Sequence, residues 1–145
     1  MYKKSNLIAG IGIDFLSVSR VDDLFIKYGC KFSKRVLGPE ELTSFSIRLN
    51  SNYKRGIRFL TTRISVKESF SKAIGIGMRS PMSWSNIQII NDDNGKPYCL
   101  LSSFLEKWFV KNYGGSIHIS ISDESDFVVS NVIVERKRSW FMFFL

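Results

Sequence analysis

The first third of the chain shows one strand-like apolar run followed by a helical pattern. Residues 7–13 are mostly apolar, rich in β-branched side chains and interrupted by glycines, which predicts a buried strand with Asp14 at its exit. Ser19 stands three positions before Asp22, a spacing typical of a helix N-cap. This helix is predicted to end at Gly29, because glycine readily adopts the backbone conformation that closes a helix.

The main helix of the chain is predicted from about residue 58 to residue 74. It follows a helix opened by residues 38–41, where a proline and two glutamates suit the first turn, and a predicted loop at residues 50–54. Apolar side chains recur in the main helix at roughly helical spacing, at Ile64, Val66, Phe70, Ala73 and Ile74. Charged residues interrupt that pattern, at Lys67, Glu68 and Lys72.

The second half of the chain predicts two hairpins separated by a helix. Residues 87–90 and 98–101 are strand-like and flank Asn94-Gly95, a strong turn signal. A helix and two further strands are predicted next, at residues 103–111, 117–122 and 127–135. Strands and helices do not alternate regularly along the chain. This order predicts an α+β fold, a single domain with an antiparallel sheet packed against helices.

Composition supports one folded domain with a basic surface. The chain has 145 residues, 44% of them hydrophobic, and a formal net charge of +8, which attracts polyanions such as nucleic acid, anionic lipid or phosphorylated molecules. Cys30 and Cys99 lack the spacing of metal ligands, and the chain has one histidine, His118, so a histidine-rich metal site is excluded. We therefore expect a cytoplasmic protein, with no signal peptide and no membrane span.

The segment GIGID supplies the first candidate site. Gly10, Gly12 and Asp14 fall on one face of the predicted strand, so a bulky ligand could lie against the backbone beside a carboxylate. The plainer interpretation is a strand weakened by glycine and followed by an aspartate in a turn. These residues alone favour the plainer interpretation.

The segment SVKESFSKAIGIG supplies the second candidate site. Ser65 and Glu68 match a capping box, and Glu68 with Lys72 matches a surface ion pair, neither of which requires a function. Alternatively, Glu68 and Asp14 would suffice to hold Mg²⁺, which takes one or two carboxylates together with water and substrate phosphate. His118 on a polar strand face is expected to bind a phosphate or to face solvent, because a strand neighbour two residues away cannot serve it as a nucleophile.

Four segments taken in order resemble one known family. GIGIDFLSVSR, RFLTTRISVKESFSKAIGIG, NDDNGKPY and IHISISDESDFVVSNVIVE are similar to segments of the holo-acyl-carrier-protein synthase family of phosphopantetheinyl transferases. The resemblance covers nearly all of residues 7–135. It implies transfer of the 4′-phosphopantetheine arm from coenzyme A to a serine of apo acyl carrier protein in fatty acid biosynthesis, with release of adenosine 3′,5′-bisphosphate.

The resemblance also implies roles for individual residues. Asp14 and Glu68 would hold Mg²⁺ on the pyrophosphate of coenzyme A, and Glu68 would orient or deprotonate the attacking serine through a water molecule. The expected contacts to coenzyme A are Lys72, Gly75 and Gly77 at the diphosphate, and Arg63 and His118 at the 3′-phosphate side. Arg20 matches the arginine that contacts the acidic carrier protein, and the family implies a homotrimer with its site between neighbouring subunits.

The sequence departs from the family pattern in two places that concern the site. Thr61-Thr62 and Ile64-Ser65 replace small, alanine-rich residues, and Ile76 stands where threonine is common. The chain also continues beyond the usual end of the family, so we expect a transferase domain at residues 1–135 and a basic, then aromatic, tail at residues 136–145. Packing on a neighbouring subunit or exposure to solvent is expected for this tail, and the alternative is that its basic cluster, Arg136-Lys137-Arg138, favours anionic lipid.

Two other functions remain open from the sequence. A family member without activity could act as a binding protein, since the departures lie near the site. A basic nucleic-acid-binding domain is the other alternative, but the aromatic residues lie mostly within apolar runs and no nucleic-acid motif is present. We therefore expect acyl carrier protein and coenzyme A, and not nucleic acid, as partners.

Overall fold

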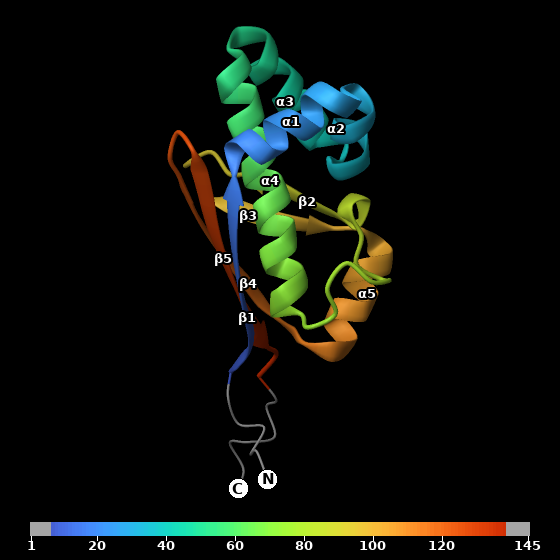
Figure 1. The fold of residues 1–145 in the computed structure, drawn as a ribbon. Coiled ribbons are helices and arrows are strands. Elements are labelled where there is room, and N and C mark those ends of the chain that lie inside the picture. Colours follow the sequence, from blue (N-terminus) through green and yellow to red (C-terminus); the bar gives the residue numbers. More distant parts are fainter. Residues whose placement is uncertain (1–6, 139–145) are drawn as a thin grey trace, which may run out of the picture.

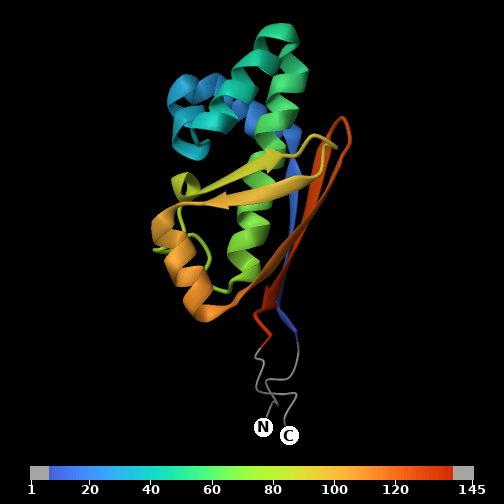
Figure 2. The ribbon, with the colours of Figure 1, turned by 180° about the vertical axis from the view of Figure 1, so that it is seen from behind.

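A computed structural model describes residues 7–138 and shows strands wrapped around one long helix, α4 (Figure 1). A three-stranded antiparallel sheet runs along one side of α4 in the order β1 (Ile8–Ser17), β5 (Phe127–Arg136) and β4 (Gly114–Asp123). The hairpin of β2 (Ile87–Asn91) and β3 (Pro97–Leu101) crosses the other side of α4, as the view from behind shows (Figure 2). The predicted α+β class and both hairpins are confirmed.

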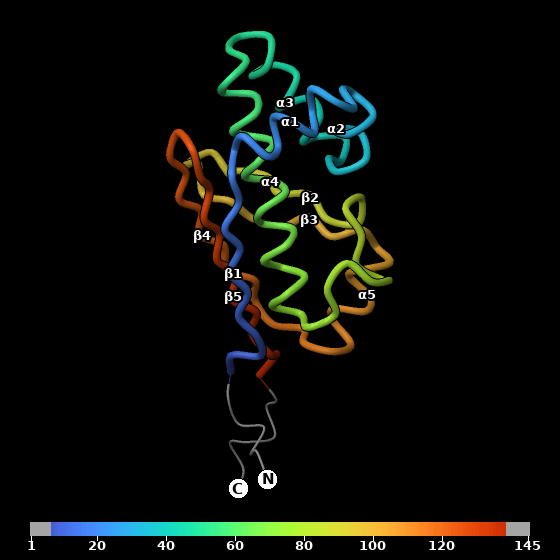
Figure 3. Tube along the Cα trace, in the orientation of Figure 1, coloured from blue at the N-terminus to red at the C-terminus, as the bar shows by residue number. Residues whose placement is uncertain are grey.

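Five α-helices are present in residues 7–138, and α4 is the longest of them. Their bounds are α1 (Val18–Tyr28), α2 (Cys30–Val36), α3 (Pro39–Ser51), α4 (Tyr53–Ala73) and α5 (Ser103–Asn112), with a short 3-10 turn, η1 (Trp84–Asn86). The tube view shows α1, α2 and α3 gathered at the N-terminal end of α4, while α5 lies toward its C-terminal end (Figure 3). No helix in this part of the chain is both long enough and apolar enough to cross a bilayer.

Two buried apolar clusters divide the core along α4. One lies between the C-terminal half of α4, the sheet, the hairpin and α5, and includes Val66, Phe70, Ile89, Leu105 and Val132. The other lies between the N-terminal half of α4 and the three preceding helices, and includes Val21, Val36, Phe45, Phe59 and Leu60. Helix α4 therefore contributes to both clusters, and its position decides how the helices sit against the sheet.

The glycines of β1 allow this strand to lie directly against the backbone of α4. A Cβ at Gly10 would stand 1.9 Å from the carbonyl oxygen of Ala73, and one at Gly12 would stand 1.8 Å from that of Ser69. Such contacts are impossible for a side chain, so only glycine fits here. The interpretation that these glycines leave room for a ligand is wrong, because α4 occupies that space.

Serine hydroxyls hold the same helix to the central strand of the sheet. Ser130 Oγ on β5 lies 2.7 Å from Ser65 Oγ and 2.6 Å from Ser69 Oγ, and all three residues are buried. Ser65 lies inside α4 and not at its beginning, so the predicted capping box with Glu68 is wrong. Ser65, which departs from the small residues of the family, instead fills a buried polar contact.

Several predicted boundaries differ from those of the structure. Helix α1 begins at Val18, so Ser19 is not its N-cap, and β1 continues to Ser17, so Asp14 lies within the strand. The predicted loop at residues 50–54 is almost entirely helical, because α3 ends at Ser51 and α4 begins at Tyr53. Asn52 alone separates them, and its side chain accepts a hydrogen bond from the backbone of the new helix.

One face of β1 is exposed, which corrects the prediction of a buried strand. Ile11 and Ile13 are each 56% exposed, and Phe15 is 63% exposed. Phe15 stacks on Phe127 of β5, with ring centroids 4.8 Å apart, and Val129 adds to the same exposed face. We call these five residues the exposed sheet face. The predicted tail segment from Trp140 to Leu145 lies outside the described residues.

Candidate active site

A cavity of about 690 Å³ opens between β1, α4 and the first two helices. Asp14 and Glu68 line it together, although 54 positions separate them in the chain. Arg20 and Arg35 bring positive charge to the same cavity, and apolar side chains such as Leu24 and Ile64 form much of its wall. The two predicted metal ligands therefore lie on one surface.

Asp14 has one carboxylate oxygen engaged and the other without a partner. Lys72 Nζ lies 3.1 Å from Asp14 Oδ1 and donates a hydrogen bond to the carbonyl oxygen of Ile13 at 2.8 Å. Asp14 Oδ2 is buried and accepts no hydrogen bond from any described residue. Buried carboxylate oxygens normally have a partner, so this oxygen is available to a cation.

Glu68 has an environment that disfavours its charge. Burial raises the pKa of Glu68, the nearby Asp14 carboxylate raises it further, and Lys72 lowers it in part. Lys72 pairs with Asp14, and among residues 7–138 no salt bridge joins it to Glu68. The interpretation of Glu68 and Lys72 as a surface ion pair is therefore wrong: both side chains face Asp14.

The residues present fit a magnesium ion. Mg²⁺ binds through one or two carboxylates and completes its octahedron with water and substrate phosphate. Asp14 and Glu68 supply two hard oxygen ligands, and the buried oxygen of Asp14 that lacks a hydrogen-bond partner is free to bind a cation. The described residues contain no cluster of three or more His, Cys, Asp or Glu, which does not conflict with a site that borrows ligands from its substrate.

The two predicted glycines lie in the turn that follows α4. Gly75 has φ 79° and Gly77 has φ 61°, both in the left-handed region that favours glycine, and a Cβ at either position would meet open space. The turn therefore favours glycine because of its backbone conformation, and not because a side chain would lack space. Ile76 lies between them and is partly buried against the apolar cluster that includes Val66 and Phe70. The residue that departs from the family therefore has a packing role.

Arg63 lies on a different face of α4 from Glu68, because five residues advance a helix by about 140°. Its guanidinium donates to the carbonyl oxygen of Ile89 at 3.2 Å, to Thr62 Oγ1 at 3.0 Å and to the Asn91 side chain. Burial lowers the pKa of Arg63 to about 10; Glu41 raises that pKa and Arg48 lowers it. Thr62, a departure from the family, helps to orient this arginine.

Arg63 belongs to a second cavity, of about 380 Å³, which we call the arginine pocket. Three further arginines line it, together with one carboxylate, at Arg48, Arg55, Arg58 and Asp123. Arg48 and Arg63 stack on the Phe59 ring, with guanidinium carbons 4.4 and 4.0 Å from its centroid. The three further arginines were not predicted as site residues, although the density of basic residues on either side of residue 52 could have indicated them.

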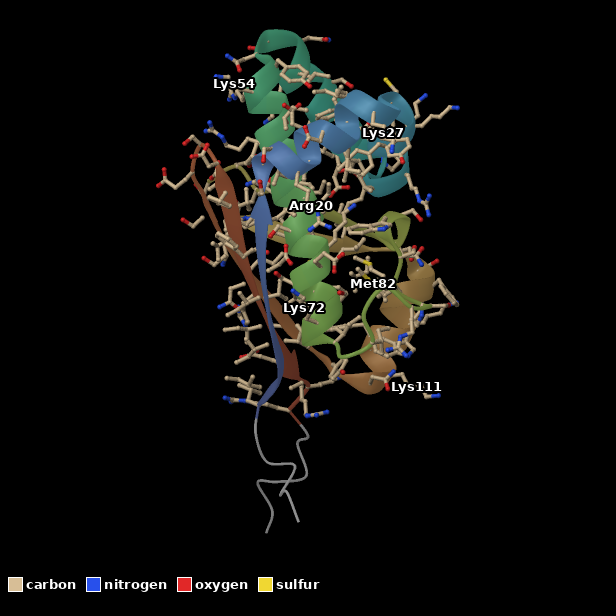
Figure 4. All side chains as sticks on the ribbon, in the orientation of Figure 1. Arg20, Lys27, Lys54, Lys72, Met82 and Lys111 are labelled. Carbon is tan, nitrogen blue, oxygen red and sulfur yellow. The ribbon has the colours of Figure 1, made fainter. Side chains whose placement is uncertain are left out.

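His118 and Arg20 occupy two further positions. His118 lies on the outer face of β4, where its Nε2 stands 3.5 Å from Glu135 Oε2, and its side chain is half exposed. Arg20 lies near the beginning of α1, and its side chain appears with that of Lys72 on the face turned to the viewer (Figure 4). Asp14, Glu68 and Arg20 thus line one cavity, with Lys72 joined to Asp14, whereas Arg63 and His118 belong to other surfaces of the chain.

Comparison with known proteins shows which family the chain belongs to. The sequence model of the 4′-phosphopantetheinyl transferase superfamily matches residues 10–131. A curated protein of Bordetella pertussis named holo-(acyl-carrier-protein) synthase is 46% identical over 130 residues, which are 90% of this chain and 84% of that protein. The chain belongs to the 4′-phosphopantetheinyl transferase superfamily.

Solved structures in this superfamily share the same fold. A holo-(acyl-carrier-protein) synthase from Neisseria meningitidis superposes with a TM-score of 0.81 at 38% identity, covering 89% of this chain and 99% of that one. Another from Bacillus anthracis, solved in complex with coenzyme A (3′,5′-ADP), gives a TM-score of 0.74 at 30% identity and covers 91% and 100% of the two chains. The transferase fold therefore extends over nearly all the described residues.

The environment of Glu68 predicts how its replacement changes stability. In metal-free buffer at pH 7, Glu68→Gln should unfold at a higher temperature than the wild type, because it removes a carboxylate whose charge is disfavoured beside Asp14. The folded-state pKa is raised, so the penalty is present above that pKa and disappears as the pH falls through it. The difference in melting temperature should therefore shrink in acid. Calorimetric scans from pH 4 to 8 measure it.

Glu124→Gln is the matched control for this stability measurement. Glu124 is exposed in the turn between β4 and β5, so its replacement should change the melting temperature little at any pH. Saturating Mg²⁺ should reduce the advantage of Glu68→Gln, because the cation compensates the two wild-type carboxylates. A Glu68→Gln variant less stable than the wild type without metal would contradict the description of this site.

Proposed function

We propose that the chain is a holo-(acyl-carrier-protein) synthase, which transfers 4′-phosphopantetheine from coenzyme A to a serine of apo acyl carrier protein and releases adenosine 3′,5′-bisphosphate. The observation that carries this proposal is the meeting of Asp14 and Glu68 in one cavity beside Arg20. Relatives that are 40–47% identical over most of the chain are named for this activity, and the Bacillus anthracis relative binds coenzyme A. The basic chain suits both polyanionic partners.

Asp14 and Glu68 are the residues that would hold Mg²⁺. When bound, the ion would neutralise charge on the diphosphate during phosphoryl transfer. Glu68 would accept the proton of the attacking serine through a water molecule, and its raised pKa favours that role. Lys72 is fixed beside Asp14 by two hydrogen bonds and would donate toward the leaving diphosphate, next to the open backbone of Gly75 and Gly77.

We place the nucleotide end of coenzyme A at Arg63 and His118. Neither lines the cavity of Asp14 and Glu68, so one chain does not present both halves of the site on one surface. Two neighbouring copies would complete it, which fits the homotrimer expected from the family. The exposed sheet face supports this assembly, because large contiguous apolar patches usually mark an interface.

The acyl carrier protein would dock on the cationic side of the cavity. Arg20 on α1 and Lys31 and Arg35 on α2 line it, and acidic partners are attracted by such a surface. A serine presented there would lie on the same side as Glu68. We further propose that residues 1–135 form the transferase domain and residues 136–145 an additional tail.

The proposed activity predicts a defined product. Wild-type protein incubated with coenzyme A, Mg²⁺ and apo acyl carrier protein should convert the carrier to a species heavier by one phosphopantetheine, seen by intact-mass spectrometry. Glu68→Gln should lower kcat by about 10²-fold or more, because both metal binding and proton transfer depend on the carboxylate. Glu124→Gln should keep the wild-type rate. Absence of product with folded wild-type protein would falsify the proposed function.

The assembly predicts that one exposed isoleucine matters and another does not. Ile13→Glu places charge on the exposed sheet face, and should convert a trimer into monomers in light scattering while abolishing transfer. Ile47→Glu is the matched control, because Ile47 is 65% exposed on α3, outside that face. A wild-type protein that is monomeric at assay concentration yet active would contradict the shared site.

A further inference from the structure

Lys67, which none of the proposed catalytic steps uses, is fully buried next to Glu68 in the chain. Its Nζ lies 2.7 Å from Glu41 Oε2, and both side chains are 0% exposed. All three ammonium hydrogens have acceptors, because Nζ also donates to the carbonyl oxygens of Val36 at 2.6 Å and Trp84 at 2.9 Å. This side chain is therefore held in one place.

Glu41 is equally well satisfied. Its Oε2 accepts a hydrogen bond from the backbone amide of Gly38 at 2.8 Å, and its Oε1 accepts one from the amide of Ile89 at 2.7 Å. The pair thus joins five parts of the chain: the end of α2, the beginning of α3, the turn η1, strand β2 and the middle of α4.

The segments that the pair holds form the cavity of the candidate active site. Val36 and Trp84, whose carbonyl oxygens accept from Lys67, both line that cavity, and so does Glu68, the next residue after Lys67. Arg35, which brings positive charge to the cavity, precedes Val36 directly. The pair therefore sets the separation between the α2–η1 wall and the wall of α4 that carries Glu68.

Stability alone is a weak reason for a buried ion pair. Removing two charges from water costs several kcal/mol per ion, and well-packed apolar residues in their place are often neutral or stabilising. Apolar side chains, however, cannot form hydrogen bonds with two carbonyl oxygens and two amides at fixed positions. A geometric role distinguishes this pair from ordinary core residues.

We propose that Lys67 and Glu41 are positioning residues, whose buried ion pair holds the α2–η1 wall at the distance from Glu68 that transfer to the carrier protein requires. This inference rests on the proposed function, and it adds two residues to the proposed site. The carrier would dock on α1 and α2, so loosening this wall would misplace its serine relative to Glu68 without removing any docking residue. The effect should appear in kcat and not in the KM for the carrier.

The decisive variant is the double replacement Lys67→Met with Glu41→Leu. It should melt below the wild-type temperature, because two carbonyl oxygens and two amides lose their partners, but it should stay folded at the assay temperature, because the two buried charges are removed together. It should nevertheless lower kcat by about tenfold or more, since small misplacements of reacting groups cost that much, while the KM for the carrier changes less than about threefold. Ser65→Ala is the matched control: it removes a buried contact between α4 and β5, and should lower the melting temperature but keep the wild-type kcat.

Hydrogen exchange gives a readout that does not depend on activity. Amides of residues 36–38 and 84–86 should exchange faster in the double variant than in the wild type, and by a larger factor than the amides of the central strand β5. If the double variant does not fold, Glu41→Gln replaces it, and its kcat should fall at least about fivefold below that of Ser65→Ala at equal melting temperature.

The outcomes separate the inference from the proposed function. A stable double variant with wild-type kcat would overturn the inference and leave the function intact. A wild-type protein that converts no carrier would overturn the function, and unchanged exchange at residues 36–38 and 84–86 would then overturn the inference independently.

Discussion

The close contact between the glycine face of β1 and the backbone of α4 is the constraint on which the site depends. Gly10 and Gly12 allow the strand to reach carbonyl oxygens of the helix that a single Cβ would block. Because the two backbones touch, Asp14 at the next inward position shares a cavity with Glu68, and Lys72 reaches both Asp14 and the backbone of β1. Glycine thus acts here through packing, and this packing brings the two carboxylates to one cavity.

The periodicity of α4 imposes a second constraint. Glu68 faces the cavity beside β1, Arg63 faces the arginine pocket beside the hairpin, and Lys67 forms the buried ion pair with Glu41. On the proposed function, one helix would supply a metal-binding carboxylate, a phosphate-binding cation and a structural cation on three of its sides. On the proposed function, groups on such separate faces would act on one extended substrate because another copy of the chain supplies part of the site.

The features of the fold that depend on local patterns could be predicted from the sequence. The hairpin around Asn94-Gly95 and the alternating strand at residues 117–122 were predictable, because turn chemistry and side-chain alternation act over a few residues. Ordered motifs also indicated Asp14 and Glu68 together. The helical character of residues 50–54 could not be predicted, since a single polar residue, Asn52, ends one helix and caps the next.

Long-range contacts explain the other differences. Ser65 resembles a cap in sequence, but its partner is Ser130 on a strand 65 positions away. Glu41 resembles an ordinary first-turn acid, yet it also neutralises Lys67, 26 positions later. No periodicity encodes such pairs, and they appear only when the elements are packed.

The most direct test of the account is the position of a bound metal. Crystals grown with coenzyme A and Mn²⁺, a cation with similar oxygen ligands, would show the ion through its anomalous scattering. The account predicts one peak coordinated by Asp14 Oδ2 and the Glu68 carboxylate, with diphosphate oxygens of coenzyme A completing the shell. A peak elsewhere, or coenzyme A bound with its diphosphate away from these two carboxylates, would contradict it.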